Sequence, residues 1–303
     1  MTPYLKSCLC TQAQIESESF RFWSEKLRPA WDGSRSGLKI LHHRKLWEWC
    51  FIAQALWERG LLRPGRRGLG FGVGREPLAA LFAGYGCEIV ASDLDEASAQ
   101  KDGWVDTNQH AARLEVLNEH GLCTPEAFRR RVQFREINMN ALPKDLRDFD
   151  FTWSSCSFEH LGSIRRGREF IYNMMHCMKP GGVGVHTTEF NLFSNRDTID
   201  NAQTVLFREQ DINEMMRVLQ SGSHRIELDL TSGDDVYDRY IDLPPYKPNP
   251  HLRLQFGAFV TTSLGLIIEK SKSSPRARWN FLPQPLFHRW AGRAAGGLLG
   301  SAK

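Results

Sequence analysis

Short apolar segments alternate with amphipathic segments from residue 66 onward. Runs of apolar residues predict strands at residues 67–72, 88–92, 132–137, 149–154, 182–187, 225–230 and 258–269. Apolar residues at helical spacing predict helices at 76–84, 108–119, 165–178 and 209–220. Strands that alternate with helices are typical of a parallel sheet covered on both faces. We therefore expect an α/β fold with a doubly wound, mostly parallel sheet of seven strands.

The sequence on either side of this pattern has a different character. Residues 20–62 are mostly helical in pattern, with a loop at 28–37 that contains Pro, Asp, Gly and Ser. This front segment cannot supply a core of its own. We expect residues 1–65 to form a helical lid over the ligand edge of a domain at 66–270, followed by a basic and aromatic tail at 271–303.

Composition excludes several classes of protein. A chain of 303 residues with 41% hydrophobic content can bury a sizeable core. No apolar run approaches the roughly 18 residues of a membrane span, and the N-terminal residues lack the order of a signal peptide. The seven cysteines are scattered and odd in number, which predicts reduced thiols. We expect a cytoplasmic protein.

The net charge of +4 is unevenly distributed. Residues 271–303 hold six Lys or Arg and no acid, which leaves 33 basic against 35 acidic residues in the remainder. The body therefore lacks the excess of positive charge that phosphates require, and nucleic acid is not the favoured partner. The tail has two interpretations: a segment partly packed on the domain, or a peripheral contact with an anionic membrane surface or a partner.

Glycine occupies every second position from Gly68 to Gly74, at the end of the first predicted strand of the sheet. In a doubly wound sheet the ligand crevice lies at the carboxyl ends of the strands, where glycines let a ligand approach the main chain. A dinucleotide site would need a third glycine where Pro77 stands, and the carboxylate of Glu76 would compete with a pyrophosphate at the helix start. The pattern disfavours NAD and FAD.

The same stretch resembles the first motif of class I S-adenosylmethionine-dependent methyltransferases, a D-x-G-x-G loop that holds the amino-acid half of the cofactor. Gly72 and Gly74 match its two glycines, and Asp93 stands where the family's acidic residue binds the ribose hydroxyls. Gly70 replaces the acid that usually precedes the glycines, so the resemblance leaves a water, Glu76 or another carboxylate such as Glu189 to hold the cofactor's amino group.

Three further segments resemble motifs of this family, in its order. Residues 135–143 resemble the third-strand motif, with Asn138 where an Asp that meets the adenine amino group is usual. Residues 149–163 and 178–190 resemble the motifs of the fourth and fifth strands. The resemblance implies S-adenosylmethionine as cofactor, held by Gly70, Gly72, Gly74, Asp93, Leu94, Asn138, Met139 and Ser155.

Candidates for acid–base chemistry follow the fourth and fifth strands of this family pattern. Methyl transfer is an in-line displacement, and an acceptor hydroxyl or ammonium must also lose a proton. The candidates are Glu159, His160, His186 and Glu189, with one histidine as base and a glutamate that orients it. Two alternatives stay open: the histidines are structural, or the four side chains bind a divalent metal. Because the spacing is not specific for a metal, we predict none.

These observations favour methyl transfer to a hydroxyl or amine of a small molecule or glycan. Methylation of RNA or protein is the alternative within the enzyme class, and it would require a basic groove beside the crevice. A non-catalytic Rossmann-like binding protein is the alternative outside it. The sequence leaves the acceptor and the oligomeric state open.

Overall fold

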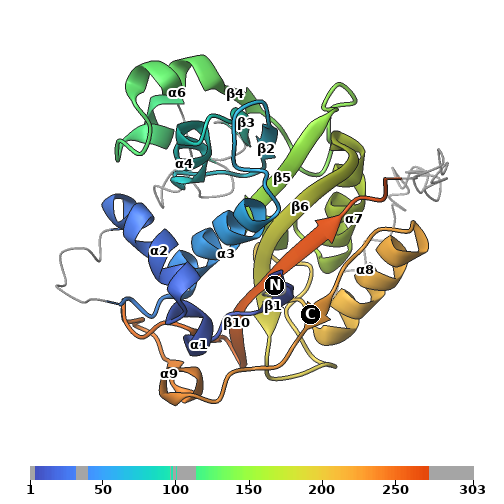
Figure 1. Cartoon of the computed structure of the whole chain (residues 1–303). Coiled ribbons are helices and arrows are strands. Elements are labelled where there is room, and N and C mark those ends of the chain that lie inside the picture. Colours follow the sequence, from blue (N-terminus) through green and yellow to red (C-terminus); the bar gives the residue numbers. More distant parts are fainter. Residues whose placement is uncertain (1–3, 32–39, 96, 98–99, 101–113, 273–303) are drawn as a thin grey trace, which may run out of the picture.

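The computed structural model describes residues 4–31, 40–95, 97, 100 and 114–272 (Figure 1). Within them, one mixed sheet of ten strands has the order β4–β3–β2–β5–β6–β10–β1–β7, with β9 beside β10 and β8 beside β9. The strands are β1 (Ser7–Leu9), β2 (Arg67–Gly70), β3 (Glu88–Asp93), β4 (Val132–Glu136), β5 (Phe149–Ser155), β6 (Met178–Asn191), β7 (Leu228–Asp229), β8 (Ile241–Asp242), β9 (Arg253–Phe256) and β10 (Phe259–Glu269).

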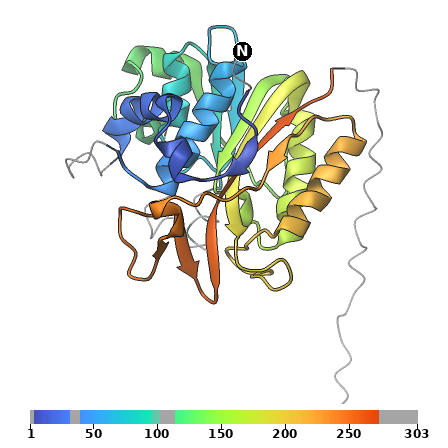
Figure 2. The same ribbon diagram turned by 60° about the horizontal axis from the view of Figure 1, so that its bottom comes forward.

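Helices cover both faces of this sheet. One apolar cluster joins α2, α3, α4 and α6 to it, and a second joins α7 and α8 (Figures 1 and 2). The helices are α1 (Gln12–Ile15), α2 (Glu18–Leu27), α3 (Arg44–Glu58), α4 (Leu78–Gly84), α6 (Pro125–Arg131), α7 (Ile164–Met174), α8 (Glu209–Ser221) and α9 (Val236–Arg239). Single 3₁₀ turns are η1 (Arg28–Ala30), η3 (Leu114–Asn118), η4 (Phe158–His160) and η5 (Met175–Cys177).

The predicted α/β class is confirmed. Strands β4, β3, β2, β5 and β6 are mutually parallel, while β10 is antiparallel to β6. The chain runs outward from β2 to β4 and returns to β5 on the other side of β2. The strand order therefore reverses between β2 and β5, and this switch point is where doubly wound sheets bind ligands at their carboxyl ends.

The predicted number of seven strands is wrong, because short strands were missed. β1, β8 and β9 have two to four residues, too few to give a period-2 pattern. The strand expected at 225–230 is reduced to β7, although Arg225 still forms a bridge with Glu269. Half of the helix expected at 108–119 falls outside the described residues, and residues 114–118 of it form η3.

The segment before residue 66 has two roles in the sheet and its covering layer. β1 lies between β10 and β7, antiparallel to the first and parallel to the second. Helix α3 packs on the sheet, where the Phe51 ring lies over Gly265 so closely that a Cβ there would be 2.3 Å from it. The N-terminal end of α3 reaches the carboxyl ends of β5 and β6. The domain limits at 65 and 270 remain predictions, and all but the first two residues of the tail lie outside the described residues.

Among the described residues, no helix has both the length and the apolar character needed to cross a membrane.

Candidate functional site

The alternating glycines of β2 accommodate aromatic side chains from the neighbouring strand. A Cβ at Gly68 would lie 2.4 Å from the Phe151 ring, and one at Gly70 would lie 2.3 Å from the Trp153 ring. Both rings pack against Phe82 of α4. The glycines of β2 were expected to let a ligand approach the main chain, but at Gly68 and Gly70 aromatic rings of β5 fill the space. Gly70 therefore lies beneath Trp153, and the geometry does not favour it as a cofactor contact.

The turn after β2 brings main chain to the switch point. Gly72 and Gly74 have φ of +54° and +50°, the left-handed region that glycine adopts without strain. The side of Gly72 where a Cβ would project is occupied, since that atom would be 2.9 Å from Ser157 Cβ and 3.3 Å from Met139 Sδ. The hydroxyl of Ser157 also donates to the Gly72 carbonyl at 3.0 Å. A ligand must therefore reach this turn from the side of Gly74.

Asp93 ends β3 beside this turn. Its carboxylate accepts hydrogen bonds from the amides of Gly74, at 3.0 Å, and Leu94, at 2.9 Å. These two bonds orient the Asp93 carboxylate at the turn, and a carboxylate is the type of group that accepts hydrogen bonds from a diol. The sequence predicted the spacing of Asp93 and the glycines, and the structure brings them into contact.

Glu76 is buried next to Pro77, which stands where the third glycine of a dinucleotide loop would be. Glu76 is 7% exposed and accepts a 2.6 Å hydrogen bond from Nε1 of Trp153. Burial raises the pKa of its carboxyl from 4.5 to about 8, against the smaller effects of this bond and of Lys45. Trp153 thus fills the space that an acid at position 70 would need, and its hydrogen bond orients the carboxyl of Glu76 instead.

The remaining predicted cofactor residues differ in exposure and in their contacts. Asn138 is exposed, and its side-chain oxygen accepts from the amide of Asn140 at 2.8 Å, which closes a turn. Met139 is buried against Gly72. Ser155 is buried and donates to Glu48 at 2.9 Å, so its hydroxyl is already engaged within the protein.

The N-terminal part of α3 supplies charged residues that the sequence analysis did not identify as a site. Glu48 is fully buried and accepts hydrogen bonds from Lys45 Nζ, the hydroxyls of Ser155 and Ser263, and the thiol of Cys156. Burial raises the pKa of Glu48, but the charges of Lys45 and Arg44 outweigh it and hold that pKa at about 2. Glu48 therefore joins α3 to the end of β5 and to the middle of β10. The available signal was a run of charges, RKLWE, at the start of an apolar helix.

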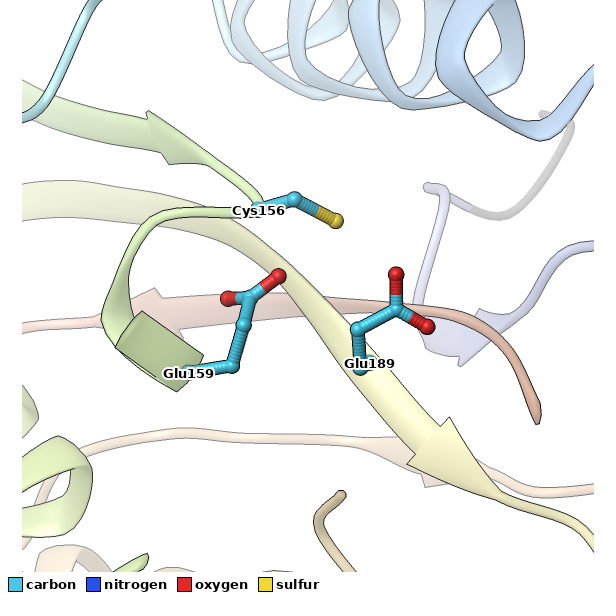
Figure 3. Close-up of side chains that lie close together, drawn as sticks. All are labelled: Cys156, Glu159 and Glu189. Carbon is cyan, nitrogen blue, oxygen red and sulfur yellow. The ribbon is translucent and has the colours of Figure 1, made fainter. Parts of the chain in front are cut away.

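Glu159, Glu189 and Cys156 converge at the ends of β5 and β6 (Figure 3). One ligand atom from each lies within 4.8 Å of the others, a spacing that also suits a metal ion. Glu189 pairs with Arg44 and accepts from Thr261 at 2.8 Å. Glu159 is fully buried and accepts from Thr188 at 3.1 Å, while its Oε1 has no hydrogen-bond partner among the described residues. Burial, with the charge of Glu189, raises the pKa of Glu159 to about 8.

The two candidate histidines differ in position. His160 belongs to η4, and its Nδ1 donates to the carbonyl of Gln203 at 3.0 Å, which leaves the lone pair of the neutral ring on Nε2. His186 is fully buried toward α7, with hydrogen bonds from its two nitrogens to Ser154 at 2.8 Å and Thr152 at 3.3 Å. Burial lowers the pKa of His186 to about 3. The geometry does not favour His186 as the base, because both ring nitrogens are already hydrogen-bonded to Ser154 and Thr152.

No family model and no curated protein matches the sequence. Several solved structures are similar. The cyclase SpnF is 15% identical, with 72% of this chain and 82% of that chain covered and a TM-score of 0.46. An S-adenosylmethionine-dependent methyltransferase from Methanosarcina mazei is 12% identical, with coverage of 71% and 97% and a TM-score of 0.44. A phosphoethanolamine N-methyltransferase from Haemonchus contortus, solved with S-adenosylmethionine, is 16% identical, with coverage of 72% and 51% and a TM-score of 0.43. Similarity at this level concerns the course of the backbone and identifies no substrate.

Proposed function

We propose that this chain is an S-adenosylmethionine-dependent methyltransferase that acts on a hydroxyl or amine of a small molecule or glycan. The observation that carries the proposal is the contact between Asp93 and the glycine turn at the switch point of the sheet. It places a fixed carboxylate beside main-chain amides where a nucleoside ligand of this sheet type binds. Cytoplasmic location is part of the proposal and rests on composition alone.

The residues at the switch point fit the parts of such a cofactor. Asp93 would accept from the ribose hydroxyls, and the main chain of the glycine turn would lie against the amino-acid end. Glu76, which is buried and has no ion pair with a described residue, would hold the ammonium group in place of the missing acid at position 70. The bound cofactor supplies an activated methyl group.

The acceptor side would use the groups beyond the end of β5. Glu159, whose pKa is raised to about 8, would accept the proton in its ionised form, while Glu189 is already paired with Arg44. His160 lies next to it on η4, with its Nδ1 hydrogen-bonded to the Gln203 carbonyl. Arg44, Lys45 and Glu48 orient these groups through Glu189 and Cys156.

A titration calorimeter tests this proposal with S-adenosylhomocysteine. Asp93→Ala should weaken binding by about 10- to 100-fold, because each charge-assisted hydrogen bond contributes about 1.5–3 kcal/mol. Glu126→Ala is the matched control, since Glu126 is an acid with a 92% exposed side chain. If the Asp93→Ala variant and the unaltered protein bind with equal affinity, Asp93 does not bind the ligand.

A non-catalytic binding protein is the second candidate. The occupied space beside Gly72 and the loss of the acid at position 70 favour it. Such a protein would bind S-adenosylhomocysteine and release no methylated product from any acceptor, so transfer of radiolabelled methyl groups separates the two.

A further inference from the structure

At the carboxyl ends of β2, β5 and β6, buried acidic side chains outnumber the basic side chains that pair with them. Glu48, Glu76, Glu159 and Glu189 are each at most 7% exposed. Among the described residues, the two ion pairs at this position are Glu48 with Lys45 and Glu189 with Arg44. Neither Glu76 nor Glu159 has an ion pair with a basic side chain of the described residues. A buried carboxylate that lacks a counter-charge is costly, so the site is suited to ligands that bring positive charge.

The two acids face different parts of the site. Glu76 belongs to the turn after β2 and is bonded to Trp153, on the cofactor side. Glu159 lies past the end of β5 beside Cys156 and Glu189 (Figure 3). If Glu76 holds the cofactor's ammonium group, Glu159 still requires a partner of its own.

Among the residues that the structure describes, Oε1 of Glu159 has no hydrogen-bond partner. It is enclosed, and Thr188 bonds only the other oxygen of the carboxyl. The ionised form needs a hydrogen-bond donor at Oε1, and the protonated form needs an acceptor there. An amine provides both, since an ammonium donates to a carboxylate and the neutral amine accepts from the acid.

Proton affinity separates an amine from a hydroxyl. Burial and the charge of Glu189 raise the pKa of Glu159 to about 8. An alkylammonium resembles the lysine side chain, with a pKa of about 10.4, whereas water has a pKa of about 15.7. The pKa of Glu159 is therefore about two units below that of an ammonium and far below that of an aliphatic hydroxyl. Glu159 can accept a proton from the ammonium but not readily from the hydroxyl.

The contacts of the other two side chains disfavour a metal ion here. Glu189 is already bonded to Arg44 and Thr261, and the Arg44 guanidinium would repel a dication. Cys156 donates its thiol proton to Glu48 at 3.1 Å, and burial raises its pKa, which disfavours the thiolate that a metal binds.

We infer that the methyl acceptor is a primary or secondary amine that enters as an ammonium, with its nitrogen at Oε1 of Glu159. This inference rests on the proposed function. The ammonium N–H bond breaks and its proton passes to Glu159. The nitrogen lone pair then forms a bond to the methyl carbon, and the bond from that carbon to sulfur breaks with its electron pair on sulfur. The methylated amine leaves as an ammonium, and Glu159 releases its proton to solvent.

Calorimetry with ethylammonium chloride, in the presence and absence of S-adenosylhomocysteine, tests the inference. Saturable binding at pH 7 is expected, weakened about 10- to 100-fold by Glu159→Gln. Ethanol at the same concentration should not compete. Glu126→Gln is the control for a lost charge, and unchanged S-adenosylhomocysteine affinity shows that Glu159→Gln is folded. Glu159→Asp, which keeps the charge, should bind more tightly than Glu159→Gln.

The outcomes are distinguishable. If the unaltered protein does not bind S-adenosylhomocysteine, the proposed function is wrong, whether or not ethylammonium binds. Binding of S-adenosylhomocysteine without ethylammonium binding, or ethylammonium binding that ignores Glu159→Gln, would end the inference alone. Saturable Mn²⁺ binding that requires Glu159 and prevents ethylammonium binding would show that the site binds a metal ion, and the inference would be wrong.

Discussion

The indole of Trp153 covers Gly70 and donates a 2.6 Å hydrogen bond to Glu76. The methyltransferases that this sequence resembles carry an acid at position 70. Here that position is closed by a ring, and the ring fixes an acid six residues later. Gly70, Trp153 and Glu76 therefore form one unit, and a change in one should alter the others.

Gly70→Ala should destabilise the fold. A Cβ at this position would lie 2.3 Å from the Trp153 ring, closer than any normal contact, so the ring must move. Overpacking of this kind costs about 1–3 kcal/mol, which denaturant unfolding measures directly. Pairing Gly70→Ala with Trp153→Phe should recover part of the loss, because the smaller ring leaves room. Strictly additive losses would contradict the contact.

Glu76→Gln should weaken only those ligands that carry the amino-acid group. We expect about 10- to 100-fold lower affinity for S-adenosylhomocysteine, since a charged hydrogen bond is removed. Methylthioadenosine lacks the ammonium and should bind both proteins alike. A calorimetric titration with each ligand gives the comparison. Equal weakening of both would show that Glu76 supports the turn rather than the ammonium.

The stability of the free protein should depend on Glu76 through pH. Its pKa is raised from 4.5 to about 8 by burial, so the unfolded chain binds fewer protons than the folded chain between these values. The free energy of unfolding is thereby lowered as pH rises through this window. Relative to Glu76→Gln, the unaltered protein should lose roughly 2–4 kcal/mol between pH 4.5 and pH 8. Parallel stability curves for the two proteins would contradict a buried, unpaired Glu76.

Glu48→Gln should be strongly destabilising. It would leave Lys45 without its ion-pair partner and remove a charged acceptor from Ser155, Cys156 and Ser263. Breaking a buried pair costs about 3–5 kcal/mol, measured by denaturant unfolding. Glu126→Gln on the surface should stay within about 0.5 kcal/mol of the unaltered protein. Similar stabilities for the two variants would show that Glu48 does not join α3 to the sheet.

The alternation of strands and helices could be predicted from the sequence because each element carries its own periodicity. The glycine turn and Asp93 could be predicted as well, since their spacing reflects one strand–helix–strand unit. β1 could not, because three residues carry no period and its partners lie at the far end of the chain.

The chemistry of the site was harder to predict for the same reason. Glu48 meets Ser155 and Ser263 across 107 and 215 residues, and no local pattern joins them. His186 was assigned to the crevice because alternation shows that residues share a strand face without showing which layer covers it. That face is closed by Phe170 of α7. The alternating glycines predicted a bare surface, but only the folded chain shows that aromatic rings of β5 fill it.

The central claim is that Asp93 holds the ribose of a bound S-adenosyl cofactor at the switch point. A crystal structure of the protein with S-adenosylhomocysteine tests it most directly. The account predicts both ribose hydroxyls within about 2.5–3.0 Å of the Asp93 carboxylate, the usual range for such bonds. A nucleoside bound elsewhere, or one whose ribose faces away from Asp93, would contradict it.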